Sequence, residues 1–398
     1  MKVKIQKGVA QGYVNAPPSK SMAHRMLICA GLSNGTCRVK GIAESKDILA
    51  TIDCLTALGA KCQKRGEDIV VTGIDITKAK SSDLLSCRES GSTLRFFIPI
   101  CLASNSETTL TGSKRLMERP LSIYEDIAKE KGMVFVRKDG NVTVKGPLGP
   151  GNYRMAGNIS SQFISGMLFA LPLLDGDSKI EITPPVESRS YIDMTIAALD
   201  SFGVDVCWQD ENTLLIPGKQ KYSAEEVYVE GDYSNAAFFE ALNAFGGNVE
   251  IGNLNEDSIQ GDRVYAGMFN RLMEEKAELD ISDCPDLGPV LFAVSGAQKG
   301  GIFKGTERLK IKESDRAAVM SKELAKFGVE VIVLENEVVV NSKGLSKPET
   351  NLCGHNDHRI VMSLAVLSTL VGGEIEGAET VNKSYPEFFS VLESLNIG

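Results

Sequence analysis

A repeated pattern along this chain constrains its fold more than any other sequence feature. Its clearest mark is a glycine that ends an expected helix and is followed by alternating apolar and polar residues. Glycine suits the left-handed position after a helix, and such alternation is typical of a strand. The marks fall at Gly59, Gly132, Gly203 and Gly328, with weaker copies around Lys276 and at Leu395–Gly398. Their spacing of 52 to 73 residues predicts six copies of one structural unit.

Each unit is expected to contain two helices of different character and then a β-hairpin. The first helix is nearly devoid of charge, and a helix that is apolar on all sides is buried. These first helices are expected at Met26–Leu32, Phe96–Ala103, Phe163–Leu174, Ala236–Phe245, Pro289–Ser295 and Ile360–Val371. The second helices are amphipathic and are expected on the outside, at Ile48–Leu58, Ile123–Lys131, Ile192–Phe202 and Ala317–Phe327. The hairpins include Ile69–Val71, Val142–Val144, Leu214–Ile216 and Val338–Val340.

Three units would make one domain, and 398 residues suffice for two domains of about 200 residues each. We expect residues 19–230 to form the first domain and residues 1–18 with 231–398 to form the second, with the crossover in 219–230. The sixth unit ends after its second helix, so we expect Met1–Lys7 to supply the missing hairpin strand. The prediction is an α/β (α+β) fold, a two-domain inside-out α/β barrel. Each domain is expected to have three βαβαββ units around three buried parallel helices, and the active site is expected in the cleft between the domains.

Charge and cysteine content restrict the classes of partner. A net charge of −9 argues against a general nucleic-acid binder, although a few focused cations can still hold a small anion. The N-terminus has no apolar signal core, and the longest apolar stretches, 96–103 and 166–174, are shorter than the roughly 20 residues that span a bilayer. The nine cysteines are scattered, as expected of thiols in a reducing cytosol. We therefore expect a cytoplasmic protein without membrane association.

Cationic side chains gather at the expected helix starts. A cation there opposes the helix macrodipole by roughly 0.3–1 kcal/mol, so its presence makes sense where an anion also binds. Ser90, Ser160 and Ser234 are equally well explained as plain N-caps, while Gly91 would let a phosphate approach the backbone closely. The cations that predict a site for phosphates and carboxylates are Lys20, Arg25, Arg119, Lys312, Arg316, Arg359 and Lys383.

Two carboxylates, Asp286 and Glu313, are expected on the same face as these cations. Lone carboxylates are more often caps or ion-pair partners, but next to cations and an anionic substrate they become candidates for proton transfer. His355 and His358 are three residues apart with no third ligand nearby, so no metal site is expected. His358 is expected to cap the sixth buried helix. No GxGxxG or GxxxxGK[ST] motif is present, and a nucleotide is therefore not indicated.

Several motifs together resemble the family of 5-enolpyruvylshikimate-3-phosphate (EPSP) synthases. They run in the family's order between Pro17 and Phe389, as Pro17–Arg25, Glu89–Arg95, Glu118–Pro120, Ser160–Phe163, Lys312–Arg316 and Asn356–Arg359. The resemblance implies transfer of the enolpyruvyl group of phosphoenolpyruvate to the 5-hydroxyl of shikimate 3-phosphate, with release of phosphate. This is the step before chorismate in aromatic amino-acid biosynthesis. In the family it passes through a non-covalent tetrahedral ketal, without metal or organic cofactor.

The resemblance also implies which residues hold each substrate. For shikimate 3-phosphate they are Lys20, Ser21, Arg25, Ser160, Ser161, Gln162, Ser188, Asp286 and Lys312. For phosphoenolpyruvate they are Lys20, Gly91, Arg119, Gln162, Arg316, Arg359 and Lys383. We expect Glu313 to act as the acid at the methylene carbon, Asp286 as the base at the hydroxyl, and Lys20 as charge stabiliser and proton carrier. The division of proton transfers among these three groups is left open.

Four positions depart from the family pattern, and the sequence also bears on two alternative functions. The departures are at Glu89, Ser92, Phe96 and Lys310, which flank the expected phosphoenolpyruvate pocket, the pocket for which glyphosate competes in this family. A sister enolpyruvyl transferase acts on UDP-N-acetylglucosamine, but it typically uses a loop cysteine that 112–117 lacks. A non-catalytic anion-binding protein would be expected to lose Asp286 or Glu313. We expect a monomeric enzyme whose partners are the two small substrates.

Overall fold

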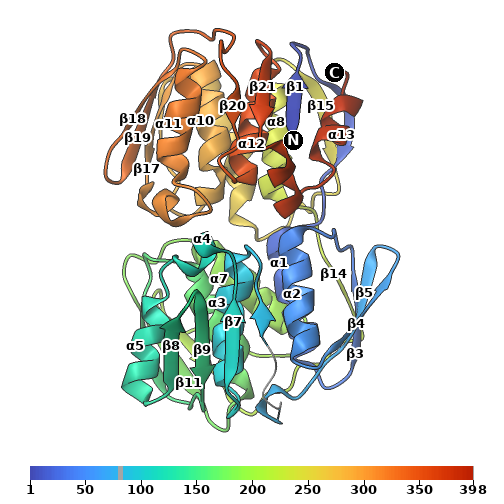
Figure 1. The fold of residues 1–398 in the computed structure, drawn as a ribbon, viewed down its shortest axis with the longest axis vertical. Coiled ribbons are helices and arrows are strands. Elements are labelled where there is room, and N and C mark those ends of the chain that lie inside the picture. The colour runs from blue at the N-terminus through green and yellow to red at the C-terminus, as the bar shows by residue number, and fades with distance from the viewer. Residues whose placement is uncertain (79–83, 398) are drawn as a thin grey trace. The chain divides into compact units, whose positions relative to one another are not determined.

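The computed structural model describes residues 1–78 and 84–397, which form two compact units. One unit contains Met1–Pro17 together with Gly231–Gly398, and the other contains Pro18–Glu230. The chain therefore passes from one unit to the other twice, after Pro17 and after Glu230 (Figure 1). Gly398, the last residue of the sixth repeat mark, lies outside the described residues. Along the described chain, no helix is both long enough and apolar enough to cross a membrane.

The unit of Pro18–Glu230 contains three copies of the repeat. Its α-helices are α1 (Lys20–Gly31), α2 (Lys46–Ala57), α3 (Gly91–Leu102), α4 (Lys114–Met117), α5 (Ser122–Lys131), α6 (Ser161–Ala170) and α7 (Arg189–Asp200). The 3-10 turns η1 (Ile76–Lys78) and η2 (Leu171–Leu173) accompany them. The strands are β3 (Thr36–Lys40), β4 (Lys61–Arg65), β5 (Asp68–Thr72), β6 (Leu85–Ser86), β7 (Thr108–Thr111), β8 (Val134–Lys138), β9 (Asn141–Lys145), β10 (Asn152–Ala156), β11 (Ser178–Thr183), β12 (Cys207–Trp208), β13 (Thr213–Ile216) and β14 (Glu226–Tyr228).

Three four-stranded sheets in this unit share one topology, which confirms the repeat. Their strand orders are β14-β3-β5-β4, β6-β7-β9-β8 and β10-β11-β13-β12. In each sheet the first pair is parallel and the two following pairs are antiparallel. The expected crossover 219–230 is more than a linker, because it contains β14, which supplies the leading strand of the first sheet.

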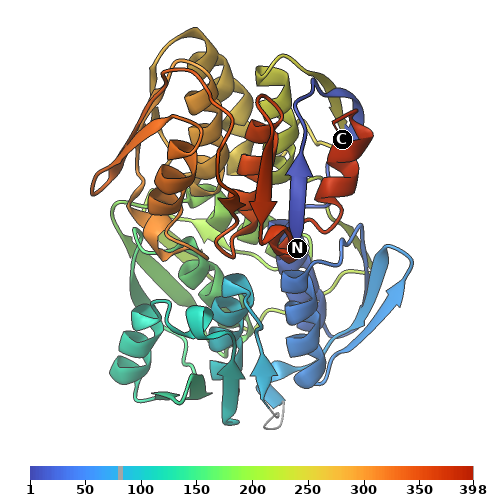
Figure 2. The same cartoon turned by 45° about the horizontal axis from the view of Figure 1, so that its top comes forward.

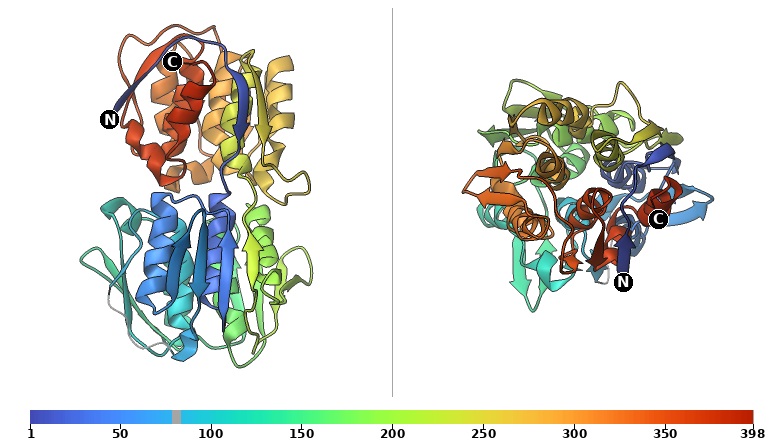
Figure 3. Two further views of the ribbon diagram at one scale, coloured as in Figure 1. Left: turned by 90° about the vertical axis from the view of Figure 1, so that its right-hand side faces the viewer. Right: turned by 90° about the horizontal axis from the view of Figure 1, so that it is seen from above.

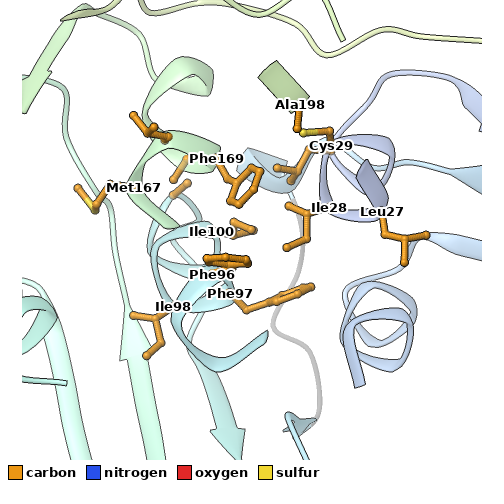
Figure 4. Close-up of a cluster of buried hydrophobic side chains, with 14 of the residues drawn as sticks. Leu27, Ile28, Cys29, Phe96, Phe97, Ile98, Ile100, Met167, Phe169 and Ala198 are labelled. Carbon is orange, nitrogen blue, oxygen red and sulfur yellow. The ribbon is translucent and has the colours of Figure 1, made fainter. Parts of the chain in front are cut away.

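The first helix of each copy is buried on all sides, as its lack of charge predicts. In α3, Phe96, Phe97 and Ile98 are each at most 1% exposed. Figure 4 shows these side chains beside Phe169 of α6 and residues of α1, and the rings of Phe96 and Phe169 meet edge to face at 5.3 Å. Burial of such aromatic side chains accounts for much of the stability of a core. The second helices expose their polar faces; α2, for example, buries Ile48 and Leu55 but leaves Lys46 exposed.

The other unit contains the remaining three copies. Its helices are α8 (Tyr233–Ala244), α9 (Tyr265–Glu274), α10 (Gly288–Ala297), α11 (Arg316–Ala325), α12 (His358–Ser368) and α13 (Phe388–Ser394). Its 3-10 turns are η3 (Gly261–Val264), η4 (Pro285–Leu287), η5 (Glu307–Ile311) and η6 (Ala378–Lys383). Its strands are β1 (Lys2–Ile5), β2 (Gln11–Asn15), β15 (Asn248–Gly252), β16 (Ala277–Asp280), β17 (Gly301–Lys304), β18 (Glu330–Val333), β19 (Glu337–Asn341), β20 (Leu352–Cys353) and β21 (Gly373–Glu376). The buried helices α8, α10 and α12 contact one another.

The start of the chain completes two sheets of this unit. Strand β1 pairs antiparallel with β21 in the order β1-β21-β20, which Figure 2 shows beside the N-terminus. It occupies the place that β19 takes in the sheet β16-β17-β19-β18. The prediction that Met1–Lys7 supplies the strand missing from the sixth copy is therefore confirmed. Strand β2 then pairs parallel with β15, as seen in the left view of Figure 3.

The prediction that a hairpin follows the second helix is wrong for the fourth copy. After α9 the chain runs directly into β16, which pairs parallel with β17 and is the leading strand of the fifth copy. Lys276–Leu279 thus marks the beginning of the next unit, not a hairpin. The shorter spacing of 52 residues that follows this mark is consistent with the shift. Within the described residues, the fourth copy contributes only the two-stranded sheet β15-β2.

Candidate active site

The starts of α1, α3 and α6 carry serine N-caps in the unit of Pro18–Glu230. Ser19, Ser90 and Ser160 accept hydrogen bonds from backbone N–H groups two or three residues ahead, as N-cap serines do. Lys20 is the first residue of α1, and its Nζ donates to Asp47 Oδ2 on α2 at 2.9 Å. A cation therefore stands at a helix start, as predicted, and a carboxylate of the same unit partly balances it.

Gly91 and Arg119 lie in direct contact. Gly91 is the first residue of α3, and Arg119 lies between α4 and α5. A Cβ atom on Gly91 would lie 2.3 Å from Arg119 Nη1 and 3.0 Å from its Cζ. The missing side chain thus makes room for a guanidinium, a neighbour that the sequence did not predict. The glycine and the arginine form one cationic surface at the start of α3.

Gln162 joins the starts of α3 and α6. Its Nε2 donates to Ser92 Oγ at 2.9 Å, and its Oε1 accepts from Arg95 Nη1 at 2.7 Å. Arg95 also lies over the ring of Phe163, 4.9 Å from its centroid. Gln162 is therefore held by residues of α3, with Ser160 and Ser161 immediately before it in the chain.

Arg25 does not lie at a helix start, which corrects the expectation. It is in the second turn of α1, 3% exposed, and its guanidinium points to α7. It donates to Thr195 Oγ1 at 2.8 Å and to the backbone oxygens of Ser21 and Tyr191 at 2.7 and 2.8 Å. Burial lowers the pKa of Arg25 to about 10. The macrodipole argument does not explain this arginine, which packs α1 against α7.

Ser188 precedes α7 in an unusual backbone conformation. Its φ of 55° and ψ of 42° lie in the left-handed region, and the residue is 2% exposed. Non-glycine residues in that region cost of the order of 1–3 kcal/mol and cluster at functional sites. The conformation is consistent with a ligand-binding role for Ser188.

A dense group of charges in the other unit centres on Arg316, the first residue of α11. Its Nη1 contacts Asp286 Oδ1 at 2.8 Å, its Nη2 contacts Glu313 Oε2 at 2.8 Å, and its Nε contacts Asp357 Oδ2 at 2.9 Å. These three carboxylates raise the pKa of Arg316 despite burial, which acts in the opposite direction. Arg316 thus remains charged and fixes three acids from separate segments.

Asp286 is held by three cations at once. Besides Arg316, it contacts Lys312 Nζ at 3.1 Å and Arg359 Nη2 at 3.0 Å. Burial alone would raise the pKa of Asp286, but Arg359, Lys312 and Arg316 hold it well below its usual range. Asp286 is consequently a carboxylate at neutral pH.

Lys312 and Glu313 lie side by side in the chain before α11. Burial lowers the pKa of Lys312 to about 8, against the opposing attraction of Asp286. An amine that titrates this near neutrality can both stabilise an anion and exchange a proton. Glu313 is 21% exposed at its side chain and forms an ion pair with Arg316.

Two acidic residues near this group were not among the predicted site residues. Asp357 is fully buried, caps α12 and accepts hydrogen bonds from Ser314 and Arg316. The expectation that His358 caps this helix is therefore wrong. Asp262 accepts from the Ser234 hydroxyl, and burial together with the charge of Asp286 raises the pKa of Asp262 to about 6. The sequence Asn356–Asp357 before His358 could have indicated the role of Asp357, whereas nothing in the sequence indicated one for Asp262.

Lys383 also departs from the expected position. It ends the 3-10 turn η6, five residues before α13 begins, and its Nζ donates to the backbone oxygen of Asn356 at 2.7 Å. Asn356 precedes Asp357, so Lys383 does border the group around Arg316. Of the seven predicted cations, Lys20, Arg316 and Arg359 lie in the first turn of an α-helix.

The fold and these charged groups define a class of protein. It is an α/β protein of repeated units in which cations at helix starts and interspersed carboxylates suit anionic substrates. Solved structures titled EPSP synthase from Acinetobacter baumannii have the same fold. One of them matches with a TM-score of 0.80 at 23% identity, covering 99% of this chain and 98% of that chain. The expected α/β fold is confirmed.

The chain belongs to the EPSP synthase family. The family model described as EPSP synthase (3-phosphoshikimate 1-carboxyvinyltransferase) matches residues 5–392. A 3-phosphoshikimate 1-carboxyvinyltransferase of Clostridium kluyveri is 40% identical, with 99% of this chain and 97% of the relative covered. That of Clostridium beijerinckii is 39% identical with the same coverage. The resemblance inferred from the motifs is confirmed, and the family is one of transferases.

Proposed function

We propose that this chain transfers the enolpyruvyl group of phosphoenolpyruvate to the 5-hydroxyl of shikimate 3-phosphate and releases phosphate, as a step of the shikimate pathway. The observation that carries the proposal is the group in which Lys312, Arg316 and Arg359 surround Asp286. Such a group combines two things that this reaction needs. It offers cationic side chains that can contact an anionic substrate and a carboxylate beside them for proton transfer.

The substrate-binding assignments keep the residues implied by the family motifs. We propose that Lys20, Ser21, Arg25, Ser160, Ser161, Gln162, Ser188, Asp286 and Lys312 hold shikimate 3-phosphate. Phosphoenolpyruvate would be held by Lys20, Gly91, Arg119, Gln162, Arg316, Arg359 and Lys383. The contact of Arg119 with Gly91 supports the second set, because it places a bidentate donor at the start of α3.

The reaction divides into an addition and an elimination. In the addition, the 5-hydroxyl oxygen bonds to C2 of phosphoenolpyruvate, the methylene carbon gains a proton, and the hydroxyl proton passes to Asp286. In the elimination, the bond from C2 to the phosphate oxygen breaks, a methyl proton is removed, and phosphate leaves with the electron pair. We assign the methylene proton to Glu313. Lys20 stabilises the charge and carries a proton.

Charge requirements account for the number of cations. Both substrates are multiply charged anions that repel each other when their reacting atoms come into contact. The arginines neutralise them with fixed, planar donors that match carboxylate and phosphate groups. We also propose that the enzyme works as a cytoplasmic monomer on these two small molecules.

An assay of phosphate release tests the proposal. The protein is incubated with phosphoenolpyruvate and either shikimate 3-phosphate or UDP-N-acetylglucosamine as the acceptor. We expect phosphate release, with formation of the enolpyruvyl ether, only with shikimate 3-phosphate. Release with only the nucleotide sugar would favour the sister transferase, and release with neither would favour a binding protein; either result overturns the proposal.

A further inference from the structure

A row of buried hydrogen-bonding side chains runs through the unit of Pro18–Glu230 and ends at the start of α3. His24 Nδ1 lies 2.8 Å from Thr51 Oγ1, which lies 2.8 Å from Thr93 Oγ1. Thr93 Oγ1 in turn donates to Ser90 Oγ at 2.8 Å. His24 lies in α1, Thr51 in α2 and Thr93 in α3, and Ser90 is the N-cap of α3. Each of the four is at most 1% exposed. None of them belongs to the substrate-binding set proposed above.

The direction of the donors along this row follows from counting hydrogens. Each hydroxyl has one hydrogen to donate. Thr93 donates its only hydroxyl hydrogen to Ser90, so it must accept from Thr51. Thr51 has then used its own hydrogen, so His24 Nδ1 must donate to Thr51. The imidazole then carries its proton on Nδ1. This agrees with His24 Nε2, a buried nitrogen that has no hydrogen-bond partner in the described part of the chain.

Ser90 ends the row with a hydrogen still to donate. Its Oγ accepts two hydrogen bonds, from the backbone N–H of Thr93 at 3.2 Å and from Thr93 Oγ1. Both donors belong to the first turn of α3, so the hydroxyl hydrogen points away from Thr93. In the described residues 1–78 and 84–397 the Ser90 hydroxyl has these two hydrogen bonds, both as acceptor, and the residue is 1% exposed. A buried donor left without an acceptor costs about 1–3 kcal/mol, which a ligand at this position would offset.

We propose that Ser90 donates a hydrogen bond to an anionic oxygen of phosphoenolpyruvate, and that His24, Thr51 and Thr93 are positioning residues that keep its hydroxyl oriented for this purpose. The inference rests on the proposed function and on phosphoenolpyruvate binding at Gly91, the next residue, and at Arg119. Three hydroxyl dipoles aligned toward the ligand add to the positive end of α3.

His24 has a defined part in this arrangement. If its Nδ1 accepted instead of donating, every hydroxyl of the row could turn round, and Ser90 would donate to Thr93 and not to the ligand. Burial, with the nearby charges of Lys20 and Arg25, lowers the pKa of His24 well below its usual value, so the ring stays neutral. A neutral ring that donates through Nδ1 blocks the reversal.

Steady-state kinetics on variants of the full chain test the donor. In Ser90→Ala we expect KM for phosphoenolpyruvate to rise about tenfold, as for the loss of a hydrogen bond to a charged group, with KM for shikimate 3-phosphate unchanged. Ser45→Ala is the matched control, because Ser45 caps α2 in the same way and is equally buried. The control should lower the thermal midpoint without the selective change in KM.

The positioning residues need a separate readout. Thr93→Val should raise KM for phosphoenolpyruvate, and Thr93→Ser, which keeps the hydroxyl, should restore it. Thr108→Val, at another buried threonine of this unit, is the control. Nitrogen-15 NMR of the unliganded protein should show His24 protonated at Nδ1, a result that does not depend on activity.

Three outcomes would overturn the inference while leaving the proposed function intact. The first is an unchanged KM for phosphoenolpyruvate in an active Ser90→Ala enzyme. The second is a Ser90→Ala enzyme whose KM values for the two substrates change to the same extent as those of Ser45→Ala. The third is a proton on Nε2 of His24. An inactive wild-type protein would instead refute the proposed function. The NMR result would still decide the orientation of the row in that case.

Discussion

The guanidinium of Arg119 lies against the backbone of Gly91, where a Cβ atom would come within 2.3 Å of Nη1. Real Cβ atoms do not approach another heavy atom so closely, so any side chain at position 91 must displace the arginine. The contact couples the conformation of a loop residue to the first turn of α3. Arg119 is also 8% exposed, which leaves it little room to move.

Gly91→Ala should therefore weaken phosphoenolpyruvate binding by moving Arg119. We expect KM for phosphoenolpyruvate to rise about tenfold or more, with a smaller effect on KM for shikimate 3-phosphate. Gly267→Ala is a matched control, because Gly267 lies in α9 with open space around its missing Cβ. The control should leave both KM values unchanged. Equal kinetics for the two variants would show that the contact has no role in binding.

Removing the carboxylate of Asp286 should reduce turnover more than substrate binding. Asp286→Asn keeps the shape of the side chain but takes away the proton acceptor, and general-base catalysis typically contributes about 100- to 10,000-fold. We expect kcat to fall within that range, as measured by phosphate release at saturating substrates. Glu313→Gln should act similarly if Glu313 supplies the methylene proton. Full activity in Glu313→Gln would refute that role.

The affinity for shikimate 3-phosphate should depend on pH through Lys312. With a pKa of about 8, the amine loses its positive charge as pH rises above that value. Binding of the anionic substrate should then weaken, and KM for shikimate 3-phosphate should rise between pH 8 and 10. Lys312→Arg keeps the charge throughout this range and should flatten the profile. A profile that is the same in both enzymes would contradict the assignment.

Asp262 should destabilise the folded protein at neutral pH. Its folded-state pKa of about 6 lies above the ordinary value of 3.8, so the folded state binds more protons between these values. Stability conferred by this residue therefore falls as pH rises from about 4 to 6. Asp262→Asn lacks this cost, and we expect it to be more stable by roughly 1–3 kcal/mol at pH 7. Urea unfolding at pH 7 and pH 4 measures the effect, which should vanish at pH 4.

The repeat made most of the fold predictable, because it gave the same local signals several times. Uncharged first helices, amphipathic second helices and a glycine with positive φ after the second helix recur, at Gly59, Gly132, Gly203 and Gly328. The pairing of β1 with the sixth copy could be predicted because that copy lacked a strand. The absence of a hairpin from the fourth copy could not be predicted, because the sequence of Ala277–Leu279 is that of a strand whether it ends the fourth copy or begins the fifth.

The candidate site was predictable in its residue types but not in its contacts. The cations stood out because they oppose the helix dipole, and that reasoning holds for Lys20, Arg316 and Arg359. Arg25 faces α7, a direction that depends on how two helices pack. Asp262 becomes notable only through burial beside Ser234 and the charge of Asp286, which the folded chain alone brings together.

Calorimetric titration of phosphoenolpyruvate into the protein saturated with 5-deoxyshikimate 3-phosphate, an acceptor analogue that lacks the reacting hydroxyl, tests the account most directly. Arg119→Ala and Arg359→Ala each remove one proposed anion ligand, one from each compact unit. Arg38→Ala removes an exposed arginine that pairs with Asp68 and serves as the control. The account predicts at least tenfold weaker binding in the first two variants and wild-type binding in the control. Wild-type affinity in both Arg119→Ala and Arg359→Ala would contradict it.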